Sequence, residues 1–143
     1  MLHQWQVWAA LCGADEQLLE PLFRQRCFDV MAAAQTRCSG FQHEVGSELA
    51  KLLSGMEEEF VDEATGYSLD FALPASRLAV EVDGPWHYYQ QLGEHVPTAK
   101  TMLKKRLLTQ AGWRVVTVPY YEWKYHLSSA ARLEYLKGAL CAA

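Results

Sequence analysis

The sequence predicts an α/β fold in which N-terminal α-helices precede a small mixed sheet made of a β-hairpin and a β-α-β crossover. Apolar residues alternate with polar ones through residues 67–73 and 78–83, the pattern of two strands joined by a short loop. A helical pattern over residues 98–111 precedes a third strand over residues 113–119. Because a strand, a helix and a strand in this order form a parallel crossover, the sheet should contain both antiparallel and parallel neighbours. A final helix is expected after residue 128.

Composition places the chain among globular proteins. Its 143 residues, 50% of them hydrophobic, suffice for one domain with a real core, and no apolar run is long enough to span a membrane. We expect no signal or transit peptide in the first residues, which lack a basic leader. The formal net charge of −4 argues against a generally basic nucleic-acid-binding surface and leaves a local basic patch as the route to such binding.

Residues 1–38 are expected to be helical throughout and to form the end of an upstream α-helical region, with residues 39–143 as the domain that follows. The apolar stripe of the first helix includes Trp5 and Trp8, which need a covering partner. Pro21 marks either a helix start or a kink.

A second amphipathic helix is predicted from Phe41 onward. Glu44 and Glu48 lie one turn apart at the border of its apolar stripe, where either could reach over the sheet. Residues 55–66 are rich in acidic side chains, and we interpret them as a solvated connector with one short strand around Phe60-Val61. No chemistry is assigned to this connector.

The predicted hairpin brings two carboxylates together. If Leu73 pairs with Leu78, antiparallel register places Asp70 opposite Glu81, and Asp83 shares their face. The opposite, apolar face is expected to consist of Leu69, Phe71, Leu73, Leu78, Val80 and Val82.

Like charges directly opposite each other repel, so this pair requires a neighbouring cation, a metal ion, or a raised pKa with a shared proton. Oxygen ligands so arranged suit Mg²⁺ or Mn²⁺. The alternative is that both carboxylates are solvated on the wet face of an antiparallel sheet. A ligand site is favoured by the residues that follow Asp83-Gly84-Pro85 over the rim of the sheet, namely Trp86, His87, Tyr88 and Tyr89.

Residues 90–97 are predicted to form a polar loop, after which Thr98 caps a helix that Gly112 closes. Lys104 falls inside the apolar arc of this helix, so it should point inward, toward the carboxylates of the hairpin. The positive segment formed by the helix and the next strand contains no acid and consists of Lys100, Lys104, Lys105, Arg106 and Arg114.

Residues 68–74, 78–87 and 103–123 closely resemble the RAP domain. This RNA-binding domain is abundant in apicomplexans and also occurs at the carboxyl end of the Fas-activated serine/threonine kinase family and of octotricopeptide-repeat proteins. The resemblance implies a restriction-endonuclease-like core, akin to the PD-(D/E)xK nucleases and the very-short-patch-repair endonuclease. It also implies a role in mitochondrial or chloroplast RNA processing, stability or translation, and a helical-repeat region upstream in the same chain.

The resemblance extends to individual residues. The acids of the nuclease motif correspond to Asp70, Glu81 and, on the preceding helix, Glu44 or Glu48. The nuclease motif has a lysine two residues after its second acid, where this chain has Asp83. By this resemblance, Lys104 is a displaced replacement for that lysine.

Three functions follow as hypotheses. The first is RNA binding by a basic segment and rim aromatics, comprising Lys100, Lys105, Arg106, Arg114, Trp86, Tyr88 and Tyr89. The second is a metal-dependent endoribonuclease in which Asp70 and Glu81 hold Mg²⁺ or Mn²⁺. In that scheme Lys104 stabilises the developing negative charge. Glu44 or Glu48 helps through a second ion or an outer-shell water, and His87 donates a proton to the leaving oxygen.

The third hypothesis is an assembly module among the subunits of a ribonucleoprotein. Its contact surface would be formed by Trp5, Trp8 and the aromatic residues of the segment 120–125. The alternative to catalysis is that Lys104 only neutralises Asp70 and Glu81 in an inert internal salt cluster, so that the domain is a nuclease relic that holds RNA without cutting it.

Overall fold

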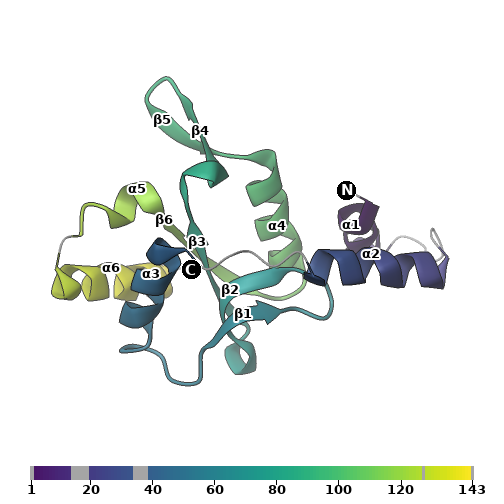
Figure 1. Cartoon of the computed structure of the whole chain (residues 1–143), viewed down its shortest axis with the longest axis horizontal. Coiled ribbons are helices and arrows are strands. Elements are labelled where there is room, and N and C mark those ends of the chain that lie inside the picture. The colour runs from purple at the N-terminus through teal and green to yellow at the C-terminus, as the bar shows by residue number, and fades with distance from the viewer. Residues whose placement is uncertain (1, 14–19, 34–38, 127, 143) are drawn as a thin grey trace.

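The computed structural model describes residues 2–13, 20–33, 39–126 and 128–142. Within this part of the chain, the main sheet has the strand order β1-β2-β3-β6, as drawn in Figure 1. β2 pairs with β1 and β3 in antiparallel fashion, whereas β6 runs parallel to β3. The predicted mixed sheet is therefore confirmed. Its strands are β1 Glu57–Val61, β2 Ser68–Leu73, β3 Leu78–Asp83 and β6 Arg114–Pro119.

Helices cover both faces of the sheet (Figure 1). On the face covered by α3 and α6, Leu136 packs in a core cluster with Phe71. On the face covered by α1 and α4, Val7 and Leu107 pack with Ala79 in a second core cluster. The helices are α1 Leu2–Leu11, α2 Pro21–Ala33, α3 Gly40–Leu49, α4 Ala99–Gln110, α5 Tyr120–Trp123 and α6 Ser129–Ala142. No helix of the described residues is long and apolar enough to cross a membrane.

The N-terminal segment is less continuous than predicted. α1 ends at Leu11, Gly13 follows with a left-handed φ of 70°, and α2 begins at Pro21. Residues 14–19 and 34–38 lie outside the described part of the chain. The predicted tryptophan stripe does not face the core, because Trp5 and Trp8 remain exposed while the core contact of α1 is made by Val7 and Ala9.

The predicted hairpin register is confirmed. Leu73 pairs with Leu78, and the loop between them is a single turn of 3-10 helix that ends at Arg77 with a left-handed φ of 52°. Proline at the first position of this turn presets the required backbone conformation.

The side-chain alternation along β2 differs from the prediction. Leu69 does not share a face with Phe71, because Leu69 packs with Ala72 in the cluster beneath α4 and Phe71 packs beneath α3. The change of face occurs at Asp70, whose carboxylate accepts a hydrogen bond from the backbone of β3. Asp70 lies opposite Glu59 of β1, and the φ of 50° at Glu59 interrupts the regular course of that strand. A local distortion of this kind changes which face the next side chain occupies.

A second hairpin stands where a polar loop was predicted. β4 Tyr88–Gln91 and β5 Glu94–Pro97 pair in antiparallel fashion and project from the body beside α4 (Figure 1). Leu92 and Gly93 form the turn, with φ values of 52° and 86°. Two-residue hairpin turns of this type require positive φ at both central positions. At the base of the hairpin, Thr98 donates its backbone N–H to the carbonyl of His87 at 2.8 Å.

The acidic connector contains a buried acid, contrary to its interpretation as a solvated segment. Asp62 is 3% exposed, and its Oδ2 accepts hydrogen bonds from the backbone N–H and hydroxyl of Thr65. Its Oδ1 accepts from Trp113 Nε1 at 3.0 Å and from Arg77 at 3.3 Å. Arg77 also lies over the indole of Trp113. Asp62 thus joins the β1–β2 turn, the first hairpin and the start of β6.

Candidate functional site

The central strand β3 positions two acids beneath α4. β3 is buried along its whole length because β2 and β6 flank it. Leu78, Val80 and Val82 pack on the α3 side, so the alternating residues Glu81 and Asp83 face the α4 side. These two acids are 6% and 3% exposed. Carboxylates this deeply buried require compensating partners.

Lys104 of α4 provides the partner of Glu81. Its Nζ donates to Glu81 Oε2 at 2.5 Å. The inward orientation of Lys104 that the helical pattern predicts is therefore confirmed. The second carboxylate oxygen of Glu81, Oε1, is buried and has no hydrogen-bond partner among the described residues.

The environment favours a proton on both members of this pair. Burial raises the pKa of Glu81 to about 8, and the charges of Asp70 and Asp83 add to the rise although Lys104 opposes it. Burial lowers the pKa of Lys104, but the charge of Glu81, with those of Asp70 and Asp83, outweighs burial and holds this pKa above its usual value. Lys104 therefore stays charged at neutral pH, and Glu81 binds its proton far more tightly than an exposed glutamate.

Asp70 is tied to the backbone of β3. Its Oδ2 accepts a hydrogen bond from the N–H of Val82 at 2.6 Å. Burial raises the pKa of Asp70, while Lys104 and the bond from Val82 oppose the rise. The pairing of β2 with β3 extends from Leu73 and Leu78 to Phe71 and Val80, one position before Asp70 and Glu81. The Asp70 side chain thus accepts the Val82 N–H where the backbone pairing of β2 with β3 ends. It also lies close enough to Glu81 for its charge to raise the pKa of Glu81.

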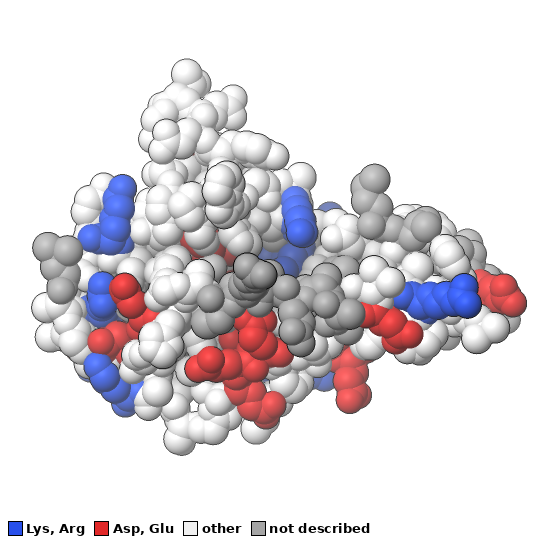
Figure 2. All heavy atoms as spheres, viewed as in Figure 1, with Lys and Arg blue, Asp and Glu red and all other residues white. Residues whose placement is uncertain are grey.

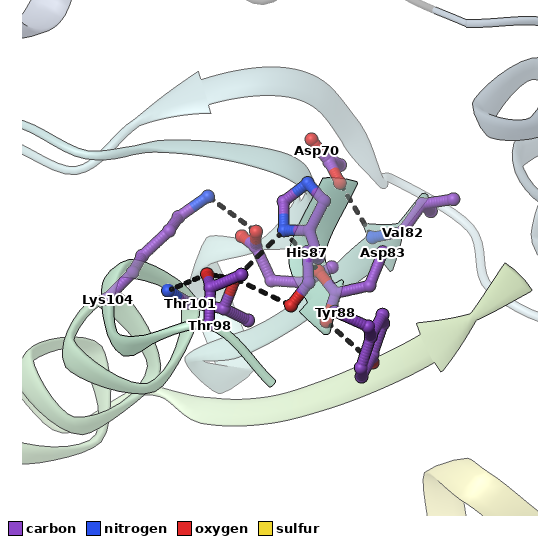
Figure 3. Close-up of polar contacts among 9 residues, drawn as sticks. Asp70, Val82, Asp83, His87, Tyr88, Thr98, Thr101 and Lys104 are labelled. Atoms are coloured by element: carbon purple, nitrogen blue, oxygen red, sulfur yellow. Dashed lines mark hydrogen bonds and ion pairs between the residues drawn. The ribbon is translucent and has the colours of Figure 1, made fainter. Parts of the chain in front are cut away.

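Asp83 organises the rim (Figure 3). Its Oδ1 lies 3.1 Å from His87 Nδ1, and its Oδ2 accepts from the Tyr88 hydroxyl at 3.1 Å. His87 Nδ1 also lies 3.2 Å from the hydroxyl of Thr101, which α4 supplies together with its capping residue Thr98. The network holds the rim histidine against the first turn of α4.

A pocket opens between the carboxyl end of β3 and the first turns of α4. Its volume is about 190 Å³. Cations and acids both line it, together with hydroxyl groups and one indole. The lining residues are Glu81, Asp83, Trp86, His87, Thr98, Lys100, Thr101, Lys104, Lys105, Val115 and Thr117.

Comparison with known proteins places these elements in a family. Residues 80–139, which run from β3 through the pocket to α6, match the family model of the RAP domain. A RAP domain-containing protein, chloroplastic, from Oryza sativa subsp. japonica is 37% identical over 108 residues, which are 74% of this chain. The chain contains a RAP domain. It spans 16% of the length of the rice relative.

The helix acids lie apart from the pocket of the RAP domain. Glu44 accepts from Trp123 Nε1 and pairs with Arg132 at 2.9 Å. Glu48 accepts from Lys51 and from Ser129, both at 2.8 Å. These contacts place both acids on the α3 and α6 side of the sheet, whereas Glu81 faces α4. The structure does not bring them to the carboxylate pair.

The residues predicted to contact RNA divide into two sets. Lys100, Lys105 and Trp86 line the pocket of the RAP domain. Arg106 is exposed outside the pocket lining, and Arg114 donates to the carbonyl of Leu140 at 3.4 Å. The rim aromatics differ in exposure, since Trp86 is 92% exposed whereas Tyr88 packs edge-on against Tyr121. Tyr89 is exposed on β4.

Metal binding by these carboxylates depends on the partners that they already have. No group of three or more His, Cys, Asp or Glu residues in the described ranges is placed to hold a metal ion. Lys104 already provides the cation beside Glu81, and both oxygens of Asp83 have partners in His87 and Tyr88. Binding of Mg²⁺ or Mn²⁺ by Asp70 and Glu81 stays a prediction.

Sequence reasoning missed the hydroxyl groups of the pocket. Thr101 and Thr117 line it, and Thr98 was identified only as a helix cap. Thr117 lies between the buried residues Val116 and Val118 of β6, and this alternation was the signal that could have placed it on the α4 side. The stacked pair of His95 and Tyr121, with ring centroids 4.1 Å apart, left no comparable signal because β5 was not predicted.

Proposed function

We propose that this RAP domain is an RNA-binding module and that the pocket between β3 and α4, with the α4 surface around it, is its contact site. The observation that carries the proposal is the convergence of Lys100, Lys104 and Lys105 with the exposed Trp86 around one pocket. Ammonium groups bind the phosphate backbone, and aromatic faces stack on unpaired bases. Membership in the RAP family supports the same function.

The distribution of charge supports a local contact. The chain has a formal net charge of −4, so long-range attraction to RNA is weak. On the face seen in Figure 2, Lys and Arg side chains occur in small separate groups among acidic ones. Binding then depends on the few cations at the pocket, and single charge reversals there should have large effects.

Salt dependence tests this proposal. The affinity of the purified chain for a labelled single-stranded RNA is measured by fluorescence anisotropy between about 50 and 200 mM salt. The slope of log affinity against log salt should be about −0.7 per phosphate contact, and Lys105→Glu should weaken binding and flatten this slope. Lys137→Glu is the matched control, because Lys137 is an exposed lysine on α6 paired with Glu134. Equal effects of the two reversals would contradict the proposed contact site.

The family and the relative support an organellar role. We infer a role in RNA processing, stability or translation within an organelle, since the rice relative is named as chloroplastic. Imaging of the full-length protein fused to a fluorescent reporter would distinguish chloroplast from mitochondrion. A cytosolic distribution would contradict the organellar assignment.

A protein-assembly role is the second candidate, and exposed rings on α1 favour it. Trp5 and Trp8 are 44% and 39% exposed. In the aromatic segment after β6, Tyr120 and Tyr121 pack against each other and Trp123 is buried, whereas Tyr125 is 75% exposed. If Trp5→Ala and Trp8→Ala abolish co-purification with ribonucleoprotein subunits while RNA affinity is unchanged, assembly is a function of α1.

A further inference from the structure

The open oxygen of Glu81 points to a ligand that the proposed RNA-binding function does not by itself specify. Glu81 Oε1 is buried without a partner among the described residues, although Glu81 lines the pocket and is only 6% exposed. An acceptor buried without a hydrogen bond is destabilising, so such atoms in native proteins usually meet a ligand or an ordered water.

The chemistry of this oxygen selects among the parts of an RNA chain. Burial raises the pKa of Glu81 to about 8, and above that pH Oε1 belongs to a carboxylate. A backbone phosphodiester carries only acceptors and repels this carboxylate, so it cannot satisfy Oε1. A nucleobase carries N–H donors next to acceptors on its Watson–Crick edge. Glu81 and Lys104 present the complementary pair, because Lys104 Nζ donates beside the open Oε1. The edge of an unpaired base can thus donate to Glu81 and accept from Lys104 together.

The mouth of the pocket suits the rest of the nucleotide. Trp86 lies at the rim and is 92% exposed, so its indole face is free to stack on a base. Lys100 and Lys105 are exposed residues of the pocket lining, where they can neutralise the flanking phosphates. The pocket lining therefore offers an acceptor, a donor, an aromatic ring and cations, which match the parts of one nucleotide.

We propose that the pocket holds one unpaired nucleotide of the bound RNA, with the base edge on Glu81 and Lys104, the ring against Trp86 and the phosphates at Lys100 and Lys105. This inference rests on the proposed RNA-binding function. It adds that a single base is extruded into the domain and that the contact is to the base as well as to the backbone.

The test compares, at pH 9 where Glu81 is ionised, two labelled twelve-nucleotide RNAs that carry the same phosphates, one with all its bases and one with abasic ribose at every position. Wild-type chain should bind the base-containing RNA at least tenfold more tightly, since each stacked base contributes about 5- to 100-fold. Trp86→Ala should remove most of this preference, and its high exposure makes loss of folding no concern. Tyr125→Ala, another exposed aromatic change at 75% exposure, is the control and should leave the preference intact.

Glu81→Gln isolates the base edge. The glutamine oxygen can still accept from Lys104, which leaves an NH₂ donor where the open acceptor stood. Binding of the base-containing RNA should fall about tenfold, whereas binding of the abasic RNA should not change. Thermal unfolding of this variant shows whether it is folded, and Trp86→Ala keeps the test valid if it is not.

The outcomes separate this inference from the proposed function. Salt-sensitive binding of both RNAs with equal affinity would overturn the nucleotide pocket and leave RNA binding standing. A preference for bases that neither Trp86→Ala nor Glu81→Gln reduces would also overturn it, because the base would then bind elsewhere. Absence of binding to either RNA would overturn both proposals.

Discussion

The indole Nε1 of Trp113 donates a hydrogen bond of 3.0 Å to Asp62 Oδ1, and both residues are almost fully buried. They lie 51 positions apart in the chain, so this bond ties the turn after β1 to the residue that precedes β6. The guanidinium of Arg77 completes the contact, since it pairs with Asp62 and lies 5.0 Å from the centroid of the Trp113 ring.

Replacing Asp62 should therefore destabilise the domain. Asp62→Ala leaves the donors of Trp113 and Thr65 buried without an acceptor, and we expect the free energy of unfolding to fall by about 2–4 kcal/mol. Urea denaturation measures the change. Glu63→Ala is the control, because this neighbouring acid is exposed and its loss should change stability by less than about 0.5 kcal/mol. Similar losses in the two variants would show that Asp62 does not have this structural role.

Stability should depend on pH through Glu81. Its pKa is about 8 in the folded state against an ordinary value of 4.5, so the folded chain binds this proton more tightly than the unfolded chain. The resulting stabilisation is complete below about pH 4.5 and is lost as pH rises toward 8.

Comparison with Glu81→Gln, which does not titrate, isolates this contribution. The unfolding temperature of the wild type relative to the variant should fall by a few degrees for each pH unit between pH 5 and 8. A constant difference across that range would mean that Glu81 is ionised throughout, held so by Lys104.

Two glycines offer a matched pair of substitutions. A Cβ at Gly46 of α3 would lie 2.7 Å from Phe71 Cζ, and this ring is 1% exposed and cannot move freely. Gly46→Ala should cost about 1–3 kcal/mol through overpacking. Gly138→Ala on α6 meets nothing within 4 Å and should stabilise the helix by about 0.5–1 kcal/mol. The unfolding temperature measured by differential scanning calorimetry should fall for Gly46→Ala and rise for Gly138→Ala. A change in the same direction for both variants would refute the packing argument.

Metal-dependent cleavage is decided by incubating end-labelled RNA with the chain and Mg²⁺ or Mn²⁺. We expect the RNA to stay intact, because Lys104 already occupies Glu81 Oε2 and Asp70 is bound to the N–H of Val82. Cleavage that requires the metal and disappears in Asp70→Ala and Glu81→Ala, while RNA binding persists, would instead establish an endoribonuclease.

The pairing of the first hairpin and the orientation of Lys104 were predictable because each depends on residues that are close together in the sequence. Apolar alternation over the first hairpin and the proline turn determine the pairing of Leu73 with Leu78, and the helical arc of α4 alone was enough to orient Lys104 inward. Leu69 was placed on the wrong face because a positive φ at Glu59 leaves no mark in a hydrophobic pattern. The position of Asp62 depends on Trp113 and Arg77, which are distant in sequence, so composition alone made it look solvated.

The second hairpin was missed for two physical reasons. Its strands are short and polar, so they lack the apolar alternation that marks a strand. Its turn is Leu92-Gly93, whereas hairpins of this type usually have Asn or Asp before the glycine. The acids of α3 were misplaced because periodicity gives the face of a helix but not the side of the sheet on which the helix packs.

The β4–β5 hairpin is closed at its base by the bond between Thr98 and His87, so β3 and α4 are joined there whatever lies farther out. Leu92 at its tip is fully exposed. Extra residues at such a tip add little to the cost of closing the loop. The hairpin is therefore a place where the chain can accept insertions, or a spectroscopic label, without a change in the sheet register, and where homologous chains can diverge in length while the pocket floor stays the same.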